Sequence, residues 1–571
     1  SRGMAIKTRS TPADLERPDG ALGHYDERTP LSTPLMGQDG AAKLGKAACN
    51  SQEGLSLTRE PLQWMRQLSA CFSWRLIVMV ICSNHVLKGF VSEGLVTRTM
   101  EFIFGEFRVS AARLQMLKAA AISPWALKPV VALMADVMPI SGYKKMPYIV
   151  LTTLASFVAA LGLGLRLVNS LEGIVLCLFL IFLQVSTINL LVDATLCEEV
   201  KENASCGPQL FTFSWLGIQA GQVLGLMILG PLIYHLGPRF SFLIAAPLIA
   251  LMLWPALANF LGEKPLPEEE RAPNTRVLRR HPVLCALTLL VGVLVLALLM
   301  GTFFLPEGSL VPLAIFICIA VPTSLWFFLR PEISGPITFY FIFGILTLNT
   351  DGALFYFYTD SADAFPSGPH FTAYFYTTGL GVAGVAGTLT GIVTGSDMFK
   401  TWTYRSILRV TMLAFASARL LLIPVLMRWN RSAGLPDGLC VLFVVFLQSM
   451  CFAWRWIPKQ VMSAHLTPQG MESTMSGLIA GTANMSMILS QYLGGFVLQL
   501  MNVRPTGAPG DHYMLADLWK VESLGALAPC CILCFLPYFV PATSQTEALI
   551  TERRDSATHG SPYERLSARW A

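Results

Sequence analysis

The chain has 571 residues, of which 53% are hydrophobic and only 13% charged, and its mean hydropathy is +0.55. A soluble protein of this length carries about a quarter charged residues, so the composition argues against a soluble enzyme and predicts a multi-pass protein of the lipid bilayer. The net charge of +5 comes mostly from loop cations and does not predict nucleic-acid binding.

The thirteen cysteines are scattered, mostly within apolar runs. No CxxC pair is followed by a second pair at zinc spacing, and no secreted disulfide framework is visible. The cluster Cys530, Cys531 and Cys534 fits apolar packing or palmitoylation better than a metal site. We therefore predict no metal site and no cofactor.

Both ends of the chain are polar. Residues 1–70 mix Pro, Gly and charges of both signs, and residues 546–571 are similar, so we expect two disordered cytoplasmic tails. The first apolar run begins only after Arg75, too far into the chain for a cleavable signal, so we expect it to act as an uncleaved anchor.

Apolar segments near the 20 or so residues needed to cross a bilayer fill the rest of the chain. They predict an all-α polytopic membrane protein of about fourteen spans. The expected spans are 75–95, 112–137, 146–168, 172–196, 209–235, 240–261, 283–304, 309–330, 336–359, 371–396, 405–427, 438–462, 474–502 and 521–543.

The pair 283–330 differs from the other spans because it carries no ionisable residue in its first run and none before Arg330 in its second. Such helices suit contact with lipid, so we predict a peripheral hairpin between two six-helix bundles. The expected divisions are a bundle at 71–262, a loop with the inserted hairpin at 263–332, and a bundle at 333–545. The competing reading has twelve spans, with the hairpin re-entrant or part of a linker.

Loop cations predict the orientation. Lys and Arg gather in the loops that we expect inside, whereas the loops 306–308 and 360–370 have neither. We therefore expect both termini in the cytoplasm. Arg98, Arg108, Arg428, Arg431 and Arg504 run against this pattern.

The segment from Trp125 to Leu151 contains a helix end, a tight basic turn and the next helix start. Asp136 closes the first helix, Gly142 lies in the turn, and Lys144 and Lys145 follow. A carboxylate and paired cations at such a bend suit a gate between two helices. A plain topogenic turn is the alternative.

Ionisable side chains within spans are costly, so each is a candidate functional residue. Cations suit an anionic substrate, whereas a buried carboxylate suits proton coupling. Pairing among these groups, which would only stabilise the bundle, is the alternative for each. The candidates are His85, Lys88, Glu93, Lys118, Lys128, Asp193, Asp351, Arg419, Arg455 and Lys459.

Asp351 opens the segment DGALFYFYT, in which Phe355 lies one turn later on nearly the same face. A carboxylate can accept from the adjacent amino group and ring N–H of a pterin, while an aromatic side chain stacks on the flat ring. Aromatic residues in membrane helices more often pack or face lipid, so this pattern is weak alone.

Four segments in order resemble the folate–biopterin transporter family, which has a major facilitator fold. They are the Lys-Pro, Asp and Pro-Ile-x-Gly-Tyr pattern of 128–143, VDATLCEEV at 192–200, DGALFYFYT at 351–359, and the block from Pro458 to Asn484. The turn carries Lys-Lys-Met where that family often has an Arg-rich run, which leaves the substrate open.

The resemblance implies secondary transport of folate or biopterin-type pteridines, proton-linked and at the plasma membrane, and no enzyme activity. On this basis we expect Asp193 and Asp351 to be the cavity carboxylates, with Lys128 or Arg419 holding the negative end of the substrate. Pro458, Gly470 and Glu472 would shape the inner turn of the second bundle, with Glu472 as a helix cap.

Three alternatives remain. Some members of that family carry S-adenosylmethionine, a cation that would depend on Asp193, Asp351 and Glu93. An intramembrane enzyme has no support from HExxH or a Ser/His pair at recognisable spacing. A channel fits less well, because charges in both halves favour alternating access.

Overall fold

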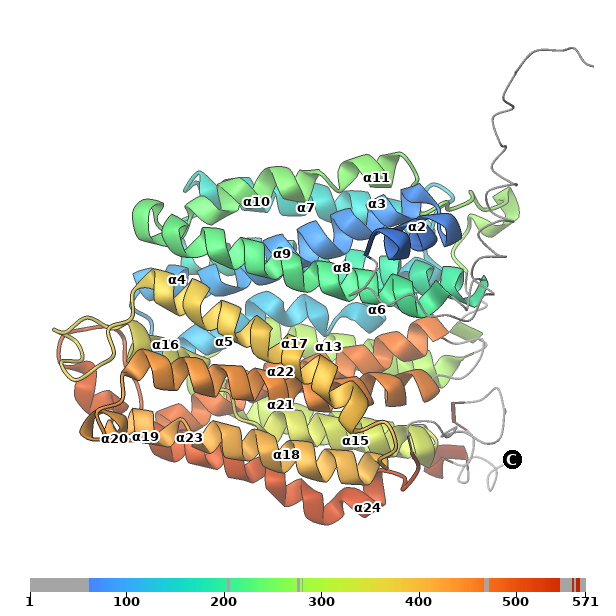
Figure 1. Ribbon diagram of the computed structural model, residues 1–571. Helices are drawn as coiled ribbons and strands as arrows, with labels where there is room; N and C mark the ends of the chain where they lie inside the picture. The colour runs from blue at the N-terminus through green and yellow to red at the C-terminus, as the bar shows by residue number, and fades with distance from the viewer. Residues whose placement is uncertain are drawn as a thin grey trace, which may run out of the picture.

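The computed structural model describes residues 61–202, 206–274, 278–279, 281–466, 472–544, 557–558 and 561–564. This part of the chain is helical and holds no named strand, only two isolated bridges. The helices run side by side along one common direction (Figure 1). The predicted all-α polytopic class is therefore confirmed.

Within the described residues, thirteen helices are long and apolar enough to cross a membrane. Several are built from two or three consecutive elements. Their bounds are α3 Trp74–Val80, η1 Ile81–Val96 and α4 Thr97–Glu106; α5 Ala111–Ile122, η2 Ser123–Trp125 and α6 Lys128–Val137; α7 Met146–Gly164; α8 Leu171–Glu202; α9 Gly207–Leu236; α10 Phe240–Ala250 and α11 Leu253–Leu257; α13 Pro282–Phe304; α14 Glu307–Phe328; α15 Pro331–Leu346 and α16 Asp351–Thr359; η5 Phe375–Gly379 and α17 Leu380–Met398; α18 Tyr404–Leu420 and α19 Ile423–Leu426; α21 Asp437–His465; and η6 Asp511–Leu515, α23 Leu518–Leu527, η7 Ala528–Phe535 and α24 Leu536–Phe539.

A fourteenth helix, α22 (Glu472–Leu500), has 29 residues, so it is about 43 Å long. This helix is less apolar than the other thirteen, because Ser, Thr, Gly and Asn interrupt its sequence. It packs on α5, α6 and α15 at the centre of the molecule rather than against lipid. Gly481 and Gly494 lie directly on Pro129 and Asn349, so small residues let the backbones approach.

The hairpin of α13 and α14 has helices of 23 and 22 residues, each long enough to span a bilayer. Its peripheral place stays a prediction: both helices expose large apolar side chains, such as Val293 in α13 and Phe316 in α14. Both helices also pack on other spans: α14 contacts α15 and α22, and α13 contacts α22, α5 and α6. Gly292 makes this contact possible, because a β-carbon there would clash with Val130.

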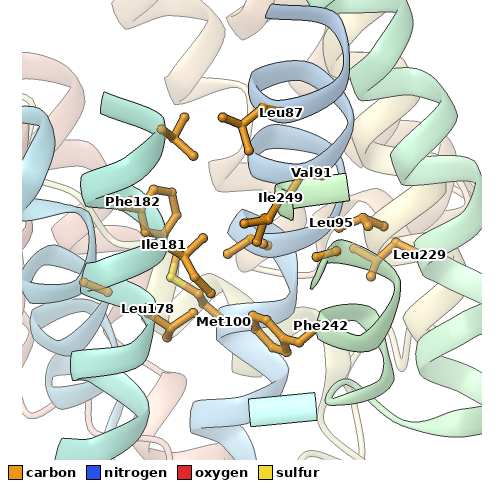
Figure 2. Packing of buried hydrophobic residues seen from close by; sticks show 14 of the residues in the cluster. Leu87, Val91, Leu95, Met100, Leu178, Ile181, Phe182, Leu229, Phe242 and Ile249 are labelled. Carbon is orange, nitrogen blue, oxygen red and sulfur yellow. The ribbon is translucent and has the colours of Figure 1, made fainter. Parts of the chain in front are cut away.

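We call the spans from Trp74 to Leu257 the first helix set and those from Pro331 to Phe539 the second helix set. The first set packs tightly where η1 meets α9: Gly94 lies on Gly225, and Gly89 lies on the backbone of Ile218. Beside this contact, side chains of η1, α4, α8, α9 and α10 form an apolar core (Figure 2).

The described ends of the chain, α2 (Pro61–Cys71) and α24, lie at one end of the bundle, which we call the terminal end (Figure 1). The opposite end, with α20 (Trp429–Ser432) and the loop 360–374, is the far end. The terminal end also carries η4 (Glu268–Glu270) and a disulfide between Cys71 and Cys206. The cysteine pattern did not predict this bond, because its partners are 135 residues apart.

Parts of both predicted tails are ordered. Residues 61–71 form α2, which buries Trp64 and Leu68 against the first helix set. In the C-terminal tail, the carbonyl of Ala557 accepts a hydrogen bond from the Arg330 amide, and Tyr563 packs on Phe328. Disorder over the full ranges 1–70 and 546–571 was therefore wrong, since these residues bury apolar surface. Residues 1–60 lie outside the described part.

Candidate functional site

Charged and aromatic side chains gather where the second span is broken, and we call this group the Asp193 cluster (Lys88, Trp125, Lys128, Asn189 and Asp193). Lys128 Nζ donates to Asn189 Oδ1 at 2.7 Å and lies 4.5 Å from the centre of the Trp125 ring. Asp193, one turn further on α8, accepts from Asn189 and interacts electrostatically with Lys88 and Lys128. Two cations thus face one carboxylate.

The helix break beside this group follows from two prolines. Pro124 lies within residues 123–127, where the span changes from α-helix to a 3₁₀ turn, and Pro129 follows in the first turn of α6, which begins at Lys128. The carbonyl of Trp125 then accepts a hydrogen bond from Asn484 Nδ2 of α22 at 2.9 Å. The break therefore joins the Asp193 cluster to the second helix set.

A second link between the sets runs through tryptophans. Lys88 Nζ lies 5.7 Å from the centre of the Trp215 ring of α9. Trp215 meets Trp456 of α21 edge to face, with ring centres 4.3 Å apart. The Asp193 cluster therefore borders the second helix set on two sides.

Nearer the far end lies the Lys118 network (Arg98, Glu101, Lys118, Asp351 and Tyr376). Lys118 is bonded to Glu101 and lies 3.6 Å from Asp351, while the Tyr376 hydroxyl donates to Glu101 at 2.7 Å. Arg98 interacts electrostatically with Glu101, Tyr376 and Asp351. The network therefore joins α4 and α5 of the first set to α16 and η5 of the second.

Burial within this network is uneven. The side chains of Glu101 and Lys118 are 2% and 8% exposed, whereas that of Asp351 is 50% exposed. An exposed carboxylate inside a span faces water rather than lipid, because lipid cannot solvate it. Asp351 is therefore the accessible carboxylate of the network.

Phe355 has a different environment from the one expected for a stacking ring. It is buried, and its ring lies edge to face against Phe102 and Tyr376, with centres 5.2 Å and 5.6 Å away. The structure therefore brings Phe355 close to the Lys118 network but packs it between the two helix sets.

Arg419 lies at the break between α15 and α16. Its Nε bonds Glu522 Oε2 at 2.7 Å, and its other nitrogens donate to the carbonyls of Thr347, Leu348 and Gly525. A broken helix leaves carbonyls without partners, and inside a membrane these must be satisfied by protein. The guanidinium is thus already engaged, and the geometry favours a structural role over a substrate clamp.

The segment in which we predict a gate forms a tight turn at the terminal end. Gly142 has φ +81°, a conformation that favours glycine, and its carbonyl accepts from the Leu266 amide. The amides of Lys145 and Met146 donate to Glu263, which caps α7. These bonds tie the turn to the loop that follows α11.

The charged residues of the turn have different partners. Lys145 Nζ bonds Glu198 at 2.9 Å and Thr195 at 3.0 Å, both on α8. The Lys144 amide donates to Glu263, while Asp136 in the last turn of α6 interacts electrostatically with Cys285 of the hairpin. These groups belong to the first helix set, to the loop that follows it or to the hairpin, and none belongs to the second helix set.

The corresponding region of the second set is less fully described. Pro458 is buried within α21, and α22 begins at Glu472, as expected for a capping residue. The side chain of Glu472 and the whole of Gly470 lie outside the described residues. Their roles stay predictions.

Sequence reasoning did not single out Glu101, Glu522, Trp125 or Tyr376. The first span was expected to end at residue 95 but continues to Glu106, which places Glu101 inside it. Glu522 lay within an expected span and was not weighed. Counting every acidic residue in the expected spans would have found Glu522, but it would have missed Glu101, because the end of the first span was placed too early.

The fold is that of known membrane transporters. An auto-inhibited peptide transporter of the POT family superposes with a TM-score of 0.58 at 16% identity, covering 83% of this chain and 98% of its own. The xylose transporter XylE from E. coli superposes with a TM-score of 0.51 at 13% identity, covering 87% and 100%. The predicted major facilitator fold is confirmed, and it defines a multi-pass membrane protein of the transporter fold class.

Family and relatives agree with this class. Residues 88–555 match the model of the BT1 family, and the chain belongs to that family. It is 23% identical over 526 residues to a probable folate-biopterin transporter 6 of Arabidopsis thaliana, covering 92% of this chain and 94% of the relative. It is 24% identical over 486 residues to a folate-biopterin transporter of Synechocystis, covering 85% of each.

Proposed function

We propose that the chain carries folate or biopterin-type pteridines across a membrane by alternating access. The observation that carries this proposal is the Asp193 cluster. It offers a carboxylate for the amino group and ring N–H of a pterin, beside the Trp125 ring on which a flat heterocycle can stack. The names of the relatives support the same substrate class.

The charge of the cluster separates two kinds of cargo. Lys88 and Lys128 outnumber Asp193, so the cluster is positive when all three are ionised. A positive site repels a sulfonium cation and suits a neutral or anionic solute. S-adenosylmethionine is therefore the less favoured cargo, and its uptake alone would contradict the assignment of this site.

Alternating access would use the two helix sets as moving bodies, divided as expected at residues 71–262 and 333–545, with the hairpin of 263–332 beside them. The Lys118 network would hold the far ends together and separate when the far side opens. The Gly142 turn, with Asp136, Lys144 and Lys145, would control the terminal end. Pro458, Gly470 and Glu472 would do so in the second set.

Proton coupling would act through Asp351. The charged groups that face it are Lys118, Arg98 and Arg419. These cations favour the ionised carboxylate while the far ends are together, so Asp351 would take up a proton once it has separated from Lys118. The bound proton would then oppose closure of the far ends, while Glu101 keeps Lys118 paired. Uptake should then be faster at acid external pH.

The positive-inside rule places the terminal end in the cytoplasm, with Lys144, Lys145, Lys400 and Arg405 near it, and we propose the plasma membrane as the location. Disulfides are rare in the cytosol. This orientation therefore predicts that Cys71 and Cys206 are reduced in intact cells and form their bond in oxidising buffer, which thiol labelling before and after lysis would test.

The experiment is uptake of labelled folate, biopterin and S-adenosylmethionine, side by side, at external pH about 5.5 and 7.5. Saturable pteridine uptake that is faster at acid pH and falls with a protonophore supports the proposal. Surface protein that takes up none of the three contradicts it. Equal pteridine uptake at both pH values keeps the cargo and rejects proton coupling.

A further inference from the structure

Two cations of α21 have no acidic partner among the residues that the structure describes. Arg455 and Lys459 lie four residues apart, so they share one face of the helix. In the described part of the chain no carboxylate lies within ion-pair distance of either, whereas Lys118 has Glu101 and Arg419 has Glu522. Unpaired charge inside a membrane span is costly and needs a reason.

Arg455 is held by aromatic rings rather than by acceptors. Its guanidinium carbon lies 4.3 Å from the centre of the Phe343 ring, 4.8 Å from that of Phe415 and 5.6 Å from that of Phe452. Ring faces stabilise the charge but do not replace in-plane acceptors of N–H bonds. Its Nη1 is buried without a hydrogen-bond partner, so the guanidinium keeps an unused donor.

One turn further, Lys459 lines a narrow pocket between α15, α21 and α22, together with Tyr340, Ser463 and Thr482. Lys459 Nζ lies 5.6 Å from the centre of the Tyr340 ring, and the Tyr340 hydroxyl is buried without a partner. An ammonium, a hydroxyl and a guanidinium thus lie along one side of α21. Donors without acceptors define a site for an anion.

This site adjoins the Asp193 cluster. Trp456 follows Arg455 in α21, and its ring contacts that of Trp215. The ammonium of Lys88 lies over the Trp215 ring. A solute whose flat end lies at Asp193 and Trp125 could therefore extend toward α21. Folates carry a pterin at one end and a glutamate with two carboxylates at the other, whereas biopterin has no carboxylate.

We propose that Arg455 and Lys459, with Tyr340, form an anchor for a carboxylate of the transported solute, so that the chain prefers pteridines that carry a carboxylate over uncharged ones. This inference rests on the proposed function and names the substrate class of the same site. Each cation would contribute charge-assisted hydrogen bonds, whose loss weakens binding about tenfold or more.

The test compares labelled folate and biopterin uptake by Arg455→Gln and Lys459→Gln. Arg409→Gln and Lys400→Gln are the matched controls, because both of these cations are exposed at the terminal end. We expect the apparent KM for folate to rise about tenfold in the anchor variants, with biopterin uptake and the controls unchanged. Arg455→Lys should restore part of the folate affinity, because lysine keeps the positive charge but lacks the planar guanidinium that can make two parallel hydrogen bonds.

A binding measurement tests the anchor without transport. p-Aminobenzoyl-glutamate carries the folate tail without the pterin, so it should raise the thermal stability of the purified wild-type protein and not that of Arg455→Gln. Equal loss of folate and biopterin uptake in the variants, or stabilisation of both proteins, overturns the anchor and leaves pteridine transport standing. Surface protein that takes up neither pteridine, with the tail fragment still stabilising only the wild type, overturns the proposed function and keeps the anchor.

Discussion

Lys118 Nζ and Asp351 Oδ2 lie 3.6 Å apart across the boundary between the two helix sets, and the same ammonium is bonded to Glu101. One cation is therefore shared between a buried carboxylate of its own set and an exposed carboxylate of the other. Breaking the second contact costs less than breaking the first, because Asp351 can be solvated when it separates. This asymmetry suits a contact that forms and breaks repeatedly.

Asp351→Asn should therefore leave a folded protein that does not transport. Lys118 stays paired with Glu101 in this variant, so surface expression should remain within about twofold of the wild type. Uptake should fall more than about tenfold, because the contact that titrates is lost. Surface biotinylation and initial uptake rates measure the two quantities. Asp363→Asn, in the exposed loop 360–374, is the matched control. Normal uptake by Asp351→Asn would remove this residue from the mechanism.

Arg419 and Glu522 should behave in the opposite way. Removing either partner leaves a buried charge, and removing Arg419 also frees the carbonyls of Thr347 and Leu348. Arg419→Gln or Glu522→Gln should therefore destabilise the protein by about 3–5 kcal/mol. Monodispersity and thermal unfolding in detergent report this loss. A stable Arg419→Gln protein with only a raised KM would instead restore the substrate clamp expected from the sequence.

Glu263 should hold the turn at the terminal end. Its carboxylate accepts from the amides of Lys144, Lys145 and Met146, so Glu263→Ala should loosen the turn at a cost of about 1 kcal/mol. Limited trypsin digestion should then cut faster after Lys144 and Lys145. The exposed Glu269→Ala serves as the control, and equal cutting rates in both variants would show that the cap does not order the turn.

A pH effect is expected at the far end. Burial, with Asp511 nearby, raises the pKa of Asp360 to about 7. A carboxyl group with a raised folded-state pKa binds a proton more tightly when folded, so its stabilising effect is full below the unfolded value of about 4 and is lost as pH rises through about 7. Hydrogen exchange in residues 360–372 should accelerate between pH 6 and 8 beyond the intrinsic base-catalysed rise.

The groups around that carboxyl define the control. His370 Nδ1 contacts the Asp360 carbonyl, and Asp511 is bonded to the amides of Gly507 and Ala508. Asp360→Asn removes the titrating group and keeps its shape. The exchange rate in residues 360–372 of this variant should then rise with pH only as steeply as the intrinsic base-catalysed rate. A pH response that persists in Asp360→Asn and disappears in His370→Gln would assign it to the histidine.

The positions of the spans could be predicted from apolar runs, because a bilayer demands continuous hydrophobic length. The partners of charged side chains could not. A sixteen-residue π-helix, η1, changes the rotation of every later residue in the first span, so the 3.6-residue period does not give the faces of Arg98 and Glu101. The breaks at 123–127 and 347–350 do the same for Lys128 and Asp351.

Arg419 shows why a residue type alone misleads. From the sequence it is an arginine in an apolar run, which suits an anionic substrate. Its partners are backbone carbonyls of a helix break, and that break lies about 70 residues earlier in the chain. No local pattern around Arg419 contains this information.

The polar character of α22 has a consequence for biosynthesis. A segment rich in Ser, Thr, Gly and Asn partitions weakly from the translocation channel into lipid by itself. The helices that it packs against most extensively, α5, α6 and α15, precede it in the chain and are already in the membrane when it is made. We expect α22 to be retained by these earlier helices, so a fusion that presents α22 alone to the insertion machinery should pass through into the lumen.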